Sequence, residues 1–463
     1  MTPRYTAAER LDRIPAGRFH RRILWLIGGG MFLDNFDSTL SAGVLGSLTA
    51  EHWSTLSLNA SFISATFAGM TLGTFWAGIL GDRFGRRFTY QANLLIIGIT
   101  SLAAALAPSM QWLIAFRFVM GLGLGAETVI GYSTMAEFVP PGVRGRWVAY
   151  LAIITNVAVA ASGLAAYFVI PKFGWRLLFA LAGLGALLVW WARKRMPESP
   201  RWLEAVGRHE EADAVLAAIE RESGGVLPDP KRTAGSHSTP SKVSLTVLFS
   251  KAVRSRTLLG SWMAVTTNIG LYGFLTWLPT FLVVQKLGVS SSLRYTMFMS
   301  LGAPFGPALA SIIADRMGRR WGLSAFAAVA AVVGMAYAAA PTMLVATVAG
   351  FFLYLLMYLV ATLGQISYIP ELFPTAYRLR GAGFCISIGR IAAALTPFAV
   401  VWGYAQGGVT LLLSVLGGML IVLSAAVAIW GVDTSRRPLE SVAPESIAKL
   451  MGAVAKTAES EMT

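Results

Sequence analysis

Long runs of apolar residues, separated by short polar segments, dominate the chain. A helix needs about 20 residues to cross a bilayer core of about 30 Å, and twelve runs are long enough. We therefore predict an all-α membrane protein with twelve transmembrane helices. Their expected limits are 23–49, 60–80, 88–107, 111–137, 147–170, 175–193, 257–284, 293–314, 321–340, 342–370, 381–403 and 409–431.

The composition supports this interpretation. Hydrophobic residues make up 55% of the chain and charged residues only 13%, whereas soluble chains carry about 25% charged residues. The single cysteine, Cys385, excludes a disulfide framework and a multi-thiolate metal site. No metal-ligand cluster and no pair of nucleophile and base stands out, so we expect no enzyme, no metal and no cofactor.

The net charge of +15 reflects topology. Most Lys and Arg residues lie in the termini, the middle segment and the loops after every second helix, whereas the opposite side holds Lys172, Lys286 and Arg294. The positive-inside rule then places both termini in the cytoplasm. We expect the protein to lie in the inner (cell) membrane. The basic residues are explained by topology and by attraction to anionic lipid, so we expect no nucleic-acid partner.

The chain divides into two halves that repeat. GILGDRFGRR (78–87) returns as SIIADRMGRR (311–320), and EFVPPGVRGR (137–146) returns as ELFPTAYRLR (371–380). Two matches in the same order imply two homologous bundles, which is typical of alternating-access transporters with a substrate site between the halves. The expected parts are a six-helix bundle (1–193), a cytoplasmic loop (194–256), a second six-helix bundle (257–431) and a cytoplasmic tail (432–463).

The loop 194–256 itself has two parts. Residues 200–223 are polar with apolar positions at helical spacing, which predicts one surface helix. Residues 223–242 are rich in Gly, Pro, Ser and Thr and predict a flexible linker.

The repeated D-R-x-G-R-R sequence resembles the signature loop of the major facilitator superfamily. RFVMGLGLG (117–125) and PESPRWL (197–203) are similar to its sugar porters and to its organic ion branch, which includes the synaptic vesicle glycoprotein 2 proteins. The opening RLDRIPAGRFHRRILWLIGGGMFLDNFD looks most like the bacterial niacin permeases of that branch. This resemblance implies twelve helices in two pseudo-symmetric bundles and transport of a small molecule.

Charged residues of the repeated loops predict a cytoplasmic latch that closes when the halves rock together. Tight turns at Gly85 and Gly318 would bring acids and arginines together. The alternative is that these arginines serve topology alone. The latch residues are Asp82, Arg83, Arg86, Arg87, Glu137, Arg144 and Arg146, and Asp315, Arg316, Arg319, Arg320, Glu371, Arg378 and Arg380.

Carboxylates inside the membrane are costly and therefore indicate function. At about 1.5 Å per residue, Asp37 on the first helix and Arg117 on the fourth lie about 7–9 Å below the same outer edge, so they can pair. The resemblance to sugar porters implies that such a pair couples transport to protons. A static ion pair is the alternative. Asp34 and Glu127 are further candidates for carrying the proton.

Arg390 lies about 13 Å into the eleventh helix, near the midplane, where an anionic substrate would neutralise it. Anion-carrying members of the organic ion branch have a basic residue on the same helix. Bonding of Arg390 to backbone carbonyls or to Asp34 is the alternative. Polar and aromatic residues that could complete a pocket, or serve helix packing, are Asn268, Tyr272, Trp277, Tyr354, Tyr358, Gln365 and Tyr368.

These features predict a monomeric, proton-coupled uptake symporter for a small aromatic monocarboxylate, with nicotinate as the first choice on resemblance. A sugar or polyol symporter is one alternative, although Thr266 and Thr267 replace the Gln pair of sugar porters. An organic cation carrier is a second alternative, which Arg390 opposes. A non-transporting receptor is a third, which transport by the purified protein would exclude.

Overall fold

The computed structural model describes residues 5–140, 143–194, 196–223, 248–251, 253–373 and 378–432. This described part is helical and contains no strand. The chain forms two compact units. Unit 1 comprises residues 1–237, 276–304 and 397–401, and unit 2 comprises 238–275, 305–396 and 402–463. The domain limits taken from the repeat stay a prediction, and the tail 433–463 and most of the linker lie outside the described residues.

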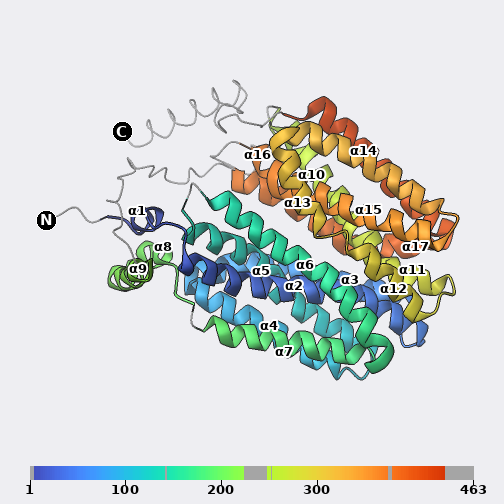
Figure 1. The fold of residues 1–463 in the computed structure, drawn as a ribbon, viewed down its shortest axis with the longest axis horizontal. Coiled ribbons are helices and arrows are strands. Elements are labelled where there is room, and N and C mark those ends of the chain that lie inside the picture. Colours follow the sequence, from blue (N-terminus) through green and yellow to red (C-terminus); the bar gives the residue numbers. More distant parts are fainter. Residues whose placement is uncertain are drawn as a thin grey trace. The chain divides into compact units, whose positions relative to one another are not determined.

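Six long helices build most of unit 1 (Figure 1). They are α2 (Arg18–Ala50), α3 (Leu56–Phe84), α4 (Arg86–Ala105), α5 (Met110–Phe138), α6 (Arg144–Phe173) and α7 (Trp175–Arg193). α3 packs along α5, α2 along α6, and α4 along α7. The approach of α3 to α5 depends on glycine, because a methyl group at Gly69 or Gly125 would overlap a backbone carbonyl of the other helix.

Two further helices, α11 (Leu278–Val284) and α12 (Val289–Ser300), also belong to unit 1. They pack against α2 and α6. A turn over residues 301–304 separates α12 from α13 (Phe305–Arg316) of unit 2. The Gly- and Pro-rich sequence at 302–307 predicts a break here, and the prediction is confirmed.

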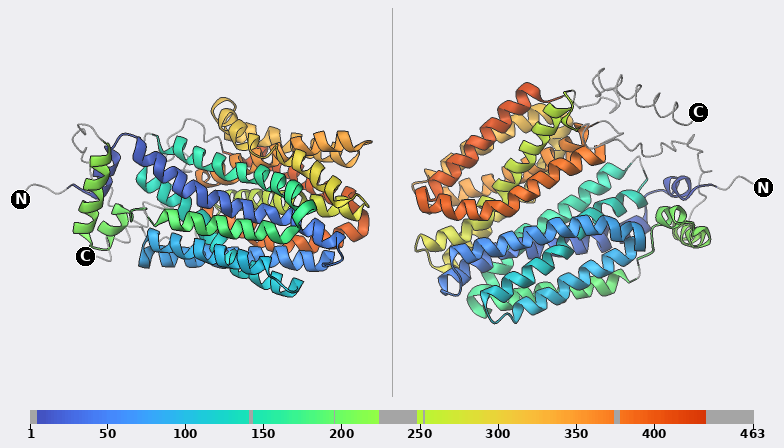
Figure 2. Two further views of the ribbon diagram at one scale, coloured as in Figure 1. Left: turned by 60° about the horizontal axis from the view of Figure 1, so that its bottom comes forward. Right: turned by 180° about the vertical axis from the view of Figure 1, so that it is seen from behind.

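Three short helices gather at the end of unit 1 where α2 begins (Figure 2). They are α1 (Ala7–Asp12), α8 (Pro200–Ala205) and α9 (His209–Ser223). The prediction of one surface helix over 200–223 is wrong, because Gly207 has φ +80° and ends the first helical segment. Ion pairs hold α1 to the other two: Arg10–Glu220 (2.8 Å) and Arg201–Asp12 (2.7 Å).

Glu220 accepts hydrogen bonds from both Arg10 and Arg13. Burial alone would raise the pKa of the Glu220 carboxyl, but these hydrogen bonds outweigh burial and hold its pKa below the ordinary value. The carboxylate is therefore ionised at neutral pH and attaches the N-terminal segment to α9.

Unit 2 contains α10 (Arg254–Asn268), the π-helix η2 (Ile269–Phe274), α13, α14 (Arg319–Ala338), α15 (Met343–Ala361), the π-helix η4 (Thr362–Tyr368), α16 (Ile369–Glu371) and most of α17 (Arg378–Trp430). A short 3-10 segment, η3 (Leu275–Trp277), leads from η2 to α11. α14 packs along α15, and both π-helices contact α10 or α15. Gly407 and Gly408 have non-helical torsion angles, so they divide α17 into two helices.

Ten helices of the described residues are long and apolar enough to cross a membrane. That number counts α17 once and leaves out α2, whose apolar run is interrupted by Asp34, Asn35 and Asp37. With α2 included and α17 divided, the fold has the twelve predicted transmembrane helices.

Candidate functional site

The first buried pair joins Asp37 on α2 to Arg117 on α5. Arg117 Nη1 lies 2.5 Å from Asp37 Oδ2, and both side chains are 1% exposed. The structure thus brings together the two residues whose depths match in the sequence. In so dry a place each charge needs the other, because removing one partner leaves the other charge uncompensated.

Other groups hold Arg117 in place independently of the Asp37 carboxylate. Its Nη2 donates to Ser41 Oγ and to the Asp37 backbone carbonyl (3.3 Å). The guanidinium carbon also lies 4.8 Å from the centre of the Phe62 ring. Neutralising Asp37 would therefore remove one charged contact without leaving Arg117 free of all partners.

The second buried pair joins Glu127 on α5 to Arg193 at the end of α7. Arg193 Nη2 lies 2.6 Å from Glu127 Oε1, and neither side chain is exposed. The same guanidinium donates to the backbone carbonyls of Leu26 (2.7 Å) and Ile27 (2.8 Å), and it lies over the Tyr90 ring at 4.5 Å. Arg193 therefore connects α7 to three other helices of unit 1.

Sequence reasoning missed Arg193, because it begins a basic run, RKR (193–195), that resembles an ordinary topology signal. A usable signal lies on another helix. The triplet Gly28–Gly30 leaves α2 without side chains at the level where Arg193 enters.

Gly30→Ala is expected to lower the thermal midpoint of the purified protein markedly. A methyl group there would overlap Arg193 Nη2 and lie 2.5 Å from Glu127 Oε1. Overpacking costs about 1–3 kcal/mol, and breaking a buried ion pair costs about 3–5 kcal/mol. Gly29→Ala is the matched control, because its methyl group would meet only Val189 at 3.7 Å. Equal midpoints for the two variants in detergent would contradict this packing.

Asp34, the third acidic candidate, is also buried on α2, at 6% exposure. The next residue, Asn35, donates to the Thr155 carbonyl of α6 (2.7 Å), and Thr39 pairs with Ser162 on the same helix (2.8 Å). This stretch of α2 thus forms a polar seam against α6.

In unit 2, three predicted substrate-binding residues lie in or next to the two π-helices. Asn268 precedes η2, Tyr272 lies in η2, and Gln365 lies in η4. Gln365 Nε2 donates to Thr267 Oγ1 (2.7 Å), and Asn268 Nδ2 donates to the Ala264 carbonyl (2.7 Å). π-Helical turns in long helices frequently mark functional sites. Both contact α10, so they form one polar region of unit 2 and the candidate substrate region.

Arg390 on α17 belongs to the same region. A methyl group at the preceding Gly389 would lie 2.8 Å from Asn268 Nδ2, so α17 passes closely against α10 at this level. The Arg390 side chain is half-buried. Tyr358 on α15 is also half-buried, and its Cβ lies beside Gly306 of α13.

Three other predicted pocket residues make contacts between or within helices. The Tyr354 hydroxyl donates to the Leu275 carbonyl (3.1 Å), and the Tyr368 hydroxyl donates to the Val432 carbonyl (2.8 Å). Trp277 is 1% exposed and stacks on Phe281. These contacts correspond to the packing alternative that the sequence left open.

The latch residues form the same ion pair in each half. Arg86 Nη2 lies 3.2 Å from Glu137 Oε1 in unit 1, and Arg319 Nε lies 3.2 Å from Glu371 Oε2 in unit 2. Gly85 and Gly318, with φ of +93° and +77°, form the predicted tight turns before these arginines. Each ion pair therefore joins two residues of the same unit, Arg86–Glu137 in unit 1 and Arg319–Glu371 in unit 2.

The remaining latch arginines have varied surroundings. Arg87 donates to the Lys194 carbonyl (2.7 Å) and Arg320 to the Ala428 carbonyl. The side chains of Arg83, Arg146, Arg316 and Arg380 are exposed. Those of Asp82, Arg144, Asp315 and Arg378 lie outside the described residues.

Glu198, in the PESPRWL sequence, is a further residue of this region that sequence reasoning did not single out. Its carboxylate accepts from the backbone N–H groups of Arg86 (2.9 Å) and Arg87 (3.2 Å), at the start of α4. A carboxylate is favourable there because the first N–H groups of a helix have no partner within the helix.

Comparison with known proteins identifies the family. The model of the Major Facilitator Superfamily matches residues 27–397. The inner membrane metabolite transport protein YdjE of Escherichia coli (strain K12) is 37% identical over 94% of this chain and 97% of its own. The niacin transporter NiaP of Acinetobacter baylyi is 32% identical over 94% and 99%, respectively. The predicted resemblance to niacin permeases is thereby confirmed.

A solved D-xylose-proton symporter has the same fold, with a TM-score of 0.68 at 18% identity over 89% of this chain and 98% of that one. Family and relatives are transporters, so this multi-pass membrane protein is a transporter and not an enzyme. The chain belongs to the major facilitator superfamily.

Proposed function

We propose that the protein is a proton-coupled uptake symporter for a small aromatic monocarboxylate, with nicotinate as the preferred substrate. It works as a monomer in the inner membrane, with both termini in the cytoplasm. Rocking of the two halves gives alternating access to the substrate.

The first buried pair is the observation on which the coupling rests. Asp37 takes up a proton from the outer side, which neutralises its carboxylate and breaks the charged contact with Arg117. Arg117 keeps its hydrogen bonds to Ser41 and the Asp37 carbonyl, but its charge loses the opposite charge, which favours a change of conformation. The proton leaves again on the inner side and restores the ion pair. Glu127 and Asp34 are the further acids that could take this role.

Substrate recognition rests on Arg390 and the π-helical region. A guanidinium binds a carboxylate through two parallel hydrogen bonds. The amides of Asn268 and Gln365 are suited to a ring nitrogen or hydroxyl, and Tyr272 and Tyr358 to the face of an aromatic ring. The name of the Acinetobacter relative supports nicotinate among such acids.

The repeated Arg–Glu pairs support the latch. Arg86–Glu137 and Arg319–Glu371 fix the start of one helix to the end of another in each half. We propose that each ion pair holds its loop rigid. The exposed arginines of the loop can then form and break the contacts that close the cytoplasmic side as the halves rock.

Equilibrium binding to the purified protein tests the substrate class. Nicotinate should bind more tightly than nicotinamide, which has the same ring without the charge, and xylose should not compete. A charged hydrogen bond contributes about 1.5–3 kcal/mol, so we expect a difference of about 10- to 100-fold. Tighter binding of nicotinamide would contradict an anion site, and competition by xylose would favour the sugar symporter.

A further inference from the structure

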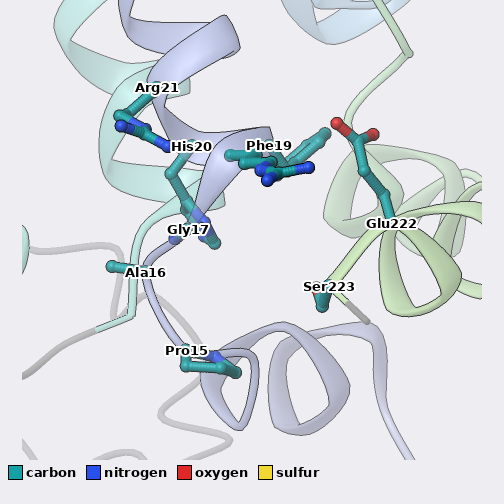
Figure 3. A pocket seen from close by; sticks show the side chains of 9 residues that line it. Pro15, Ala16, Gly17, Phe19, His20, Arg21, Glu222 and Ser223 are labelled. Atoms are coloured by element: carbon teal, nitrogen blue, oxygen red, sulfur yellow. Dashed lines mark hydrogen bonds between the residues drawn. The ribbon is translucent and has the colours of Figure 1, made fainter. Parts of the chain in front are cut away.

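A cavity of about 480 Å³ opens between the start of α2 and the end of α9. Residues 15–21 form most of its wall, and Glu222 and Ser223 face them (Figure 3). His20 is a buried residue of this wall and fixes the backbone around it. Its Nδ1 accepts the Gly17 N–H (3.2 Å) and its Nε2 donates to the Phe138 carbonyl (3.2 Å). The turn before α2 is thus held in place by the hydrogen bonds of His20, of which the one to Phe138 is buried.

A second cavity, of about 350 Å³, adjoins the first and shares Ala16, Gly17 and Arg21 with it. Its other wall is apolar and consists of Leu24, Trp25, Trp147 and Tyr150. The Trp25 side chain is 66% exposed and that of Tyr150 is 44% exposed. Trp and Tyr exposed at the ends of transmembrane helices are typical of the membrane–water interface.

The charge of the first cavity favours an anion. Arg18 and Arg21 are exposed, and neither forms an ion pair with another described residue. The acid in the wall, Glu222, already pairs with Arg22 at 2.9 Å. The two adjoining cavities therefore present a cationic part, with Arg21 at the junction, and an apolar part.

We propose that these cavities bind one anionic phospholipid of the leaflet that this end of unit 1 faces. Arg21 and Arg18 hold the phosphate and headgroup, because a guanidinium matches phosphate oxygens in geometry and charge. The first part of an acyl chain lies along Trp25 and Tyr150. A free phosphate would use only the cationic part, whereas a phospholipid uses both. The lipid thereby anchors the start of α2, the helix that carries Asp37.

The test follows the thermal midpoint of the full-length protein in neutral detergent as phosphatidylglycerol is added. We expect the midpoint to rise, and Arg21→Gln to raise the half-maximal lipid concentration about fivefold. Arg254→Gln is the matched control, since Arg254 is an exposed arginine at the start of α10, 233 residues after Arg21. The same spacing separates Asp82 from Asp315 in the repeat.

A second pair of variants tests the apolar part. Trp25→Ala should also weaken the response to phosphatidylglycerol, whereas Leu258→Ala, its exposed equivalent on α10, should not. An unchanged response of Arg21→Gln, or an equal loss in Arg254→Gln, would overturn the site. An equal rise with inorganic phosphate alone would show a free-anion site instead of a lipid site.

Discussion

Asp37→Asn is expected to abolish proton-driven accumulation of the substrate while leaving exchange of substrate across the membrane partly intact. Asparagine keeps the size of the side chain but cannot carry the proton. A gradient of one pH unit drives at most about tenfold accumulation for each proton carried, and the variant should reach only equal concentrations on both sides. Uptake and exchange of labelled nicotinate in liposomes measure the two activities separately.

Glu127→Gln is the matched comparison, because it also neutralises one acid of a fully buried ion pair in unit 1. Retained exchange in either variant shows that the protein is folded and that its substrate site works. Loss of accumulation in Glu127→Gln together with normal accumulation in Asp37→Asn would assign the proton to the second buried pair and contradict the proposed role of Asp37.

Arg390→Gln is expected to weaken nicotinate binding by about 10- to 100-fold, because a charged hydrogen bond contributes about 1.5–3 kcal/mol. Binding of nicotinamide should change much less, since it lacks the carboxylate that Arg390 would hold. Titration of both ligands against the purified variant and the unmodified protein gives the two ratios.

Arg390→Lys separates the charge from the geometry. Lysine keeps the positive charge but cannot form two parallel hydrogen bonds, so intermediate nicotinate affinity is expected. If Arg390→Gln weakened both ligands equally, Arg390 would support the fold of α17 and would not recognise the carboxylate.

The helices and the first buried pair could be predicted from the sequence for physical reasons. A bilayer requires apolar runs of a minimum length, and a buried charge requires an opposite charge at the same depth. Residue counting therefore sufficed to connect Asp37 with Arg117. The sequence also predicts the last two helices as separate, and the structure divides them at Gly407 and Gly408.

Other features depend on packing that residue counting does not capture. Arg193 ends its helix like an ordinary topology arginine, and only the approach of α2 at Gly30 turns it inward. The π-helices η2 and η4 lie inside long runs that the sequence predicts as regular helices, and residue counting does not reveal the wider turns. Tyr354 and Tyr368 are predicted pocket residues, but their hydroxyls donate hydrogen bonds to backbone carbonyls.

Uptake of labelled nicotinate into liposomes that contain the purified protein measures substrate choice and proton coupling together. We expect saturable accumulation above the external concentration when the outside is more acidic, and loss of that accumulation when a proton ionophore removes the gradient. Saturable uptake that ignores the proton gradient would contradict the coupling through Asp37, and no uptake by folded protein would contradict nicotinate as the substrate.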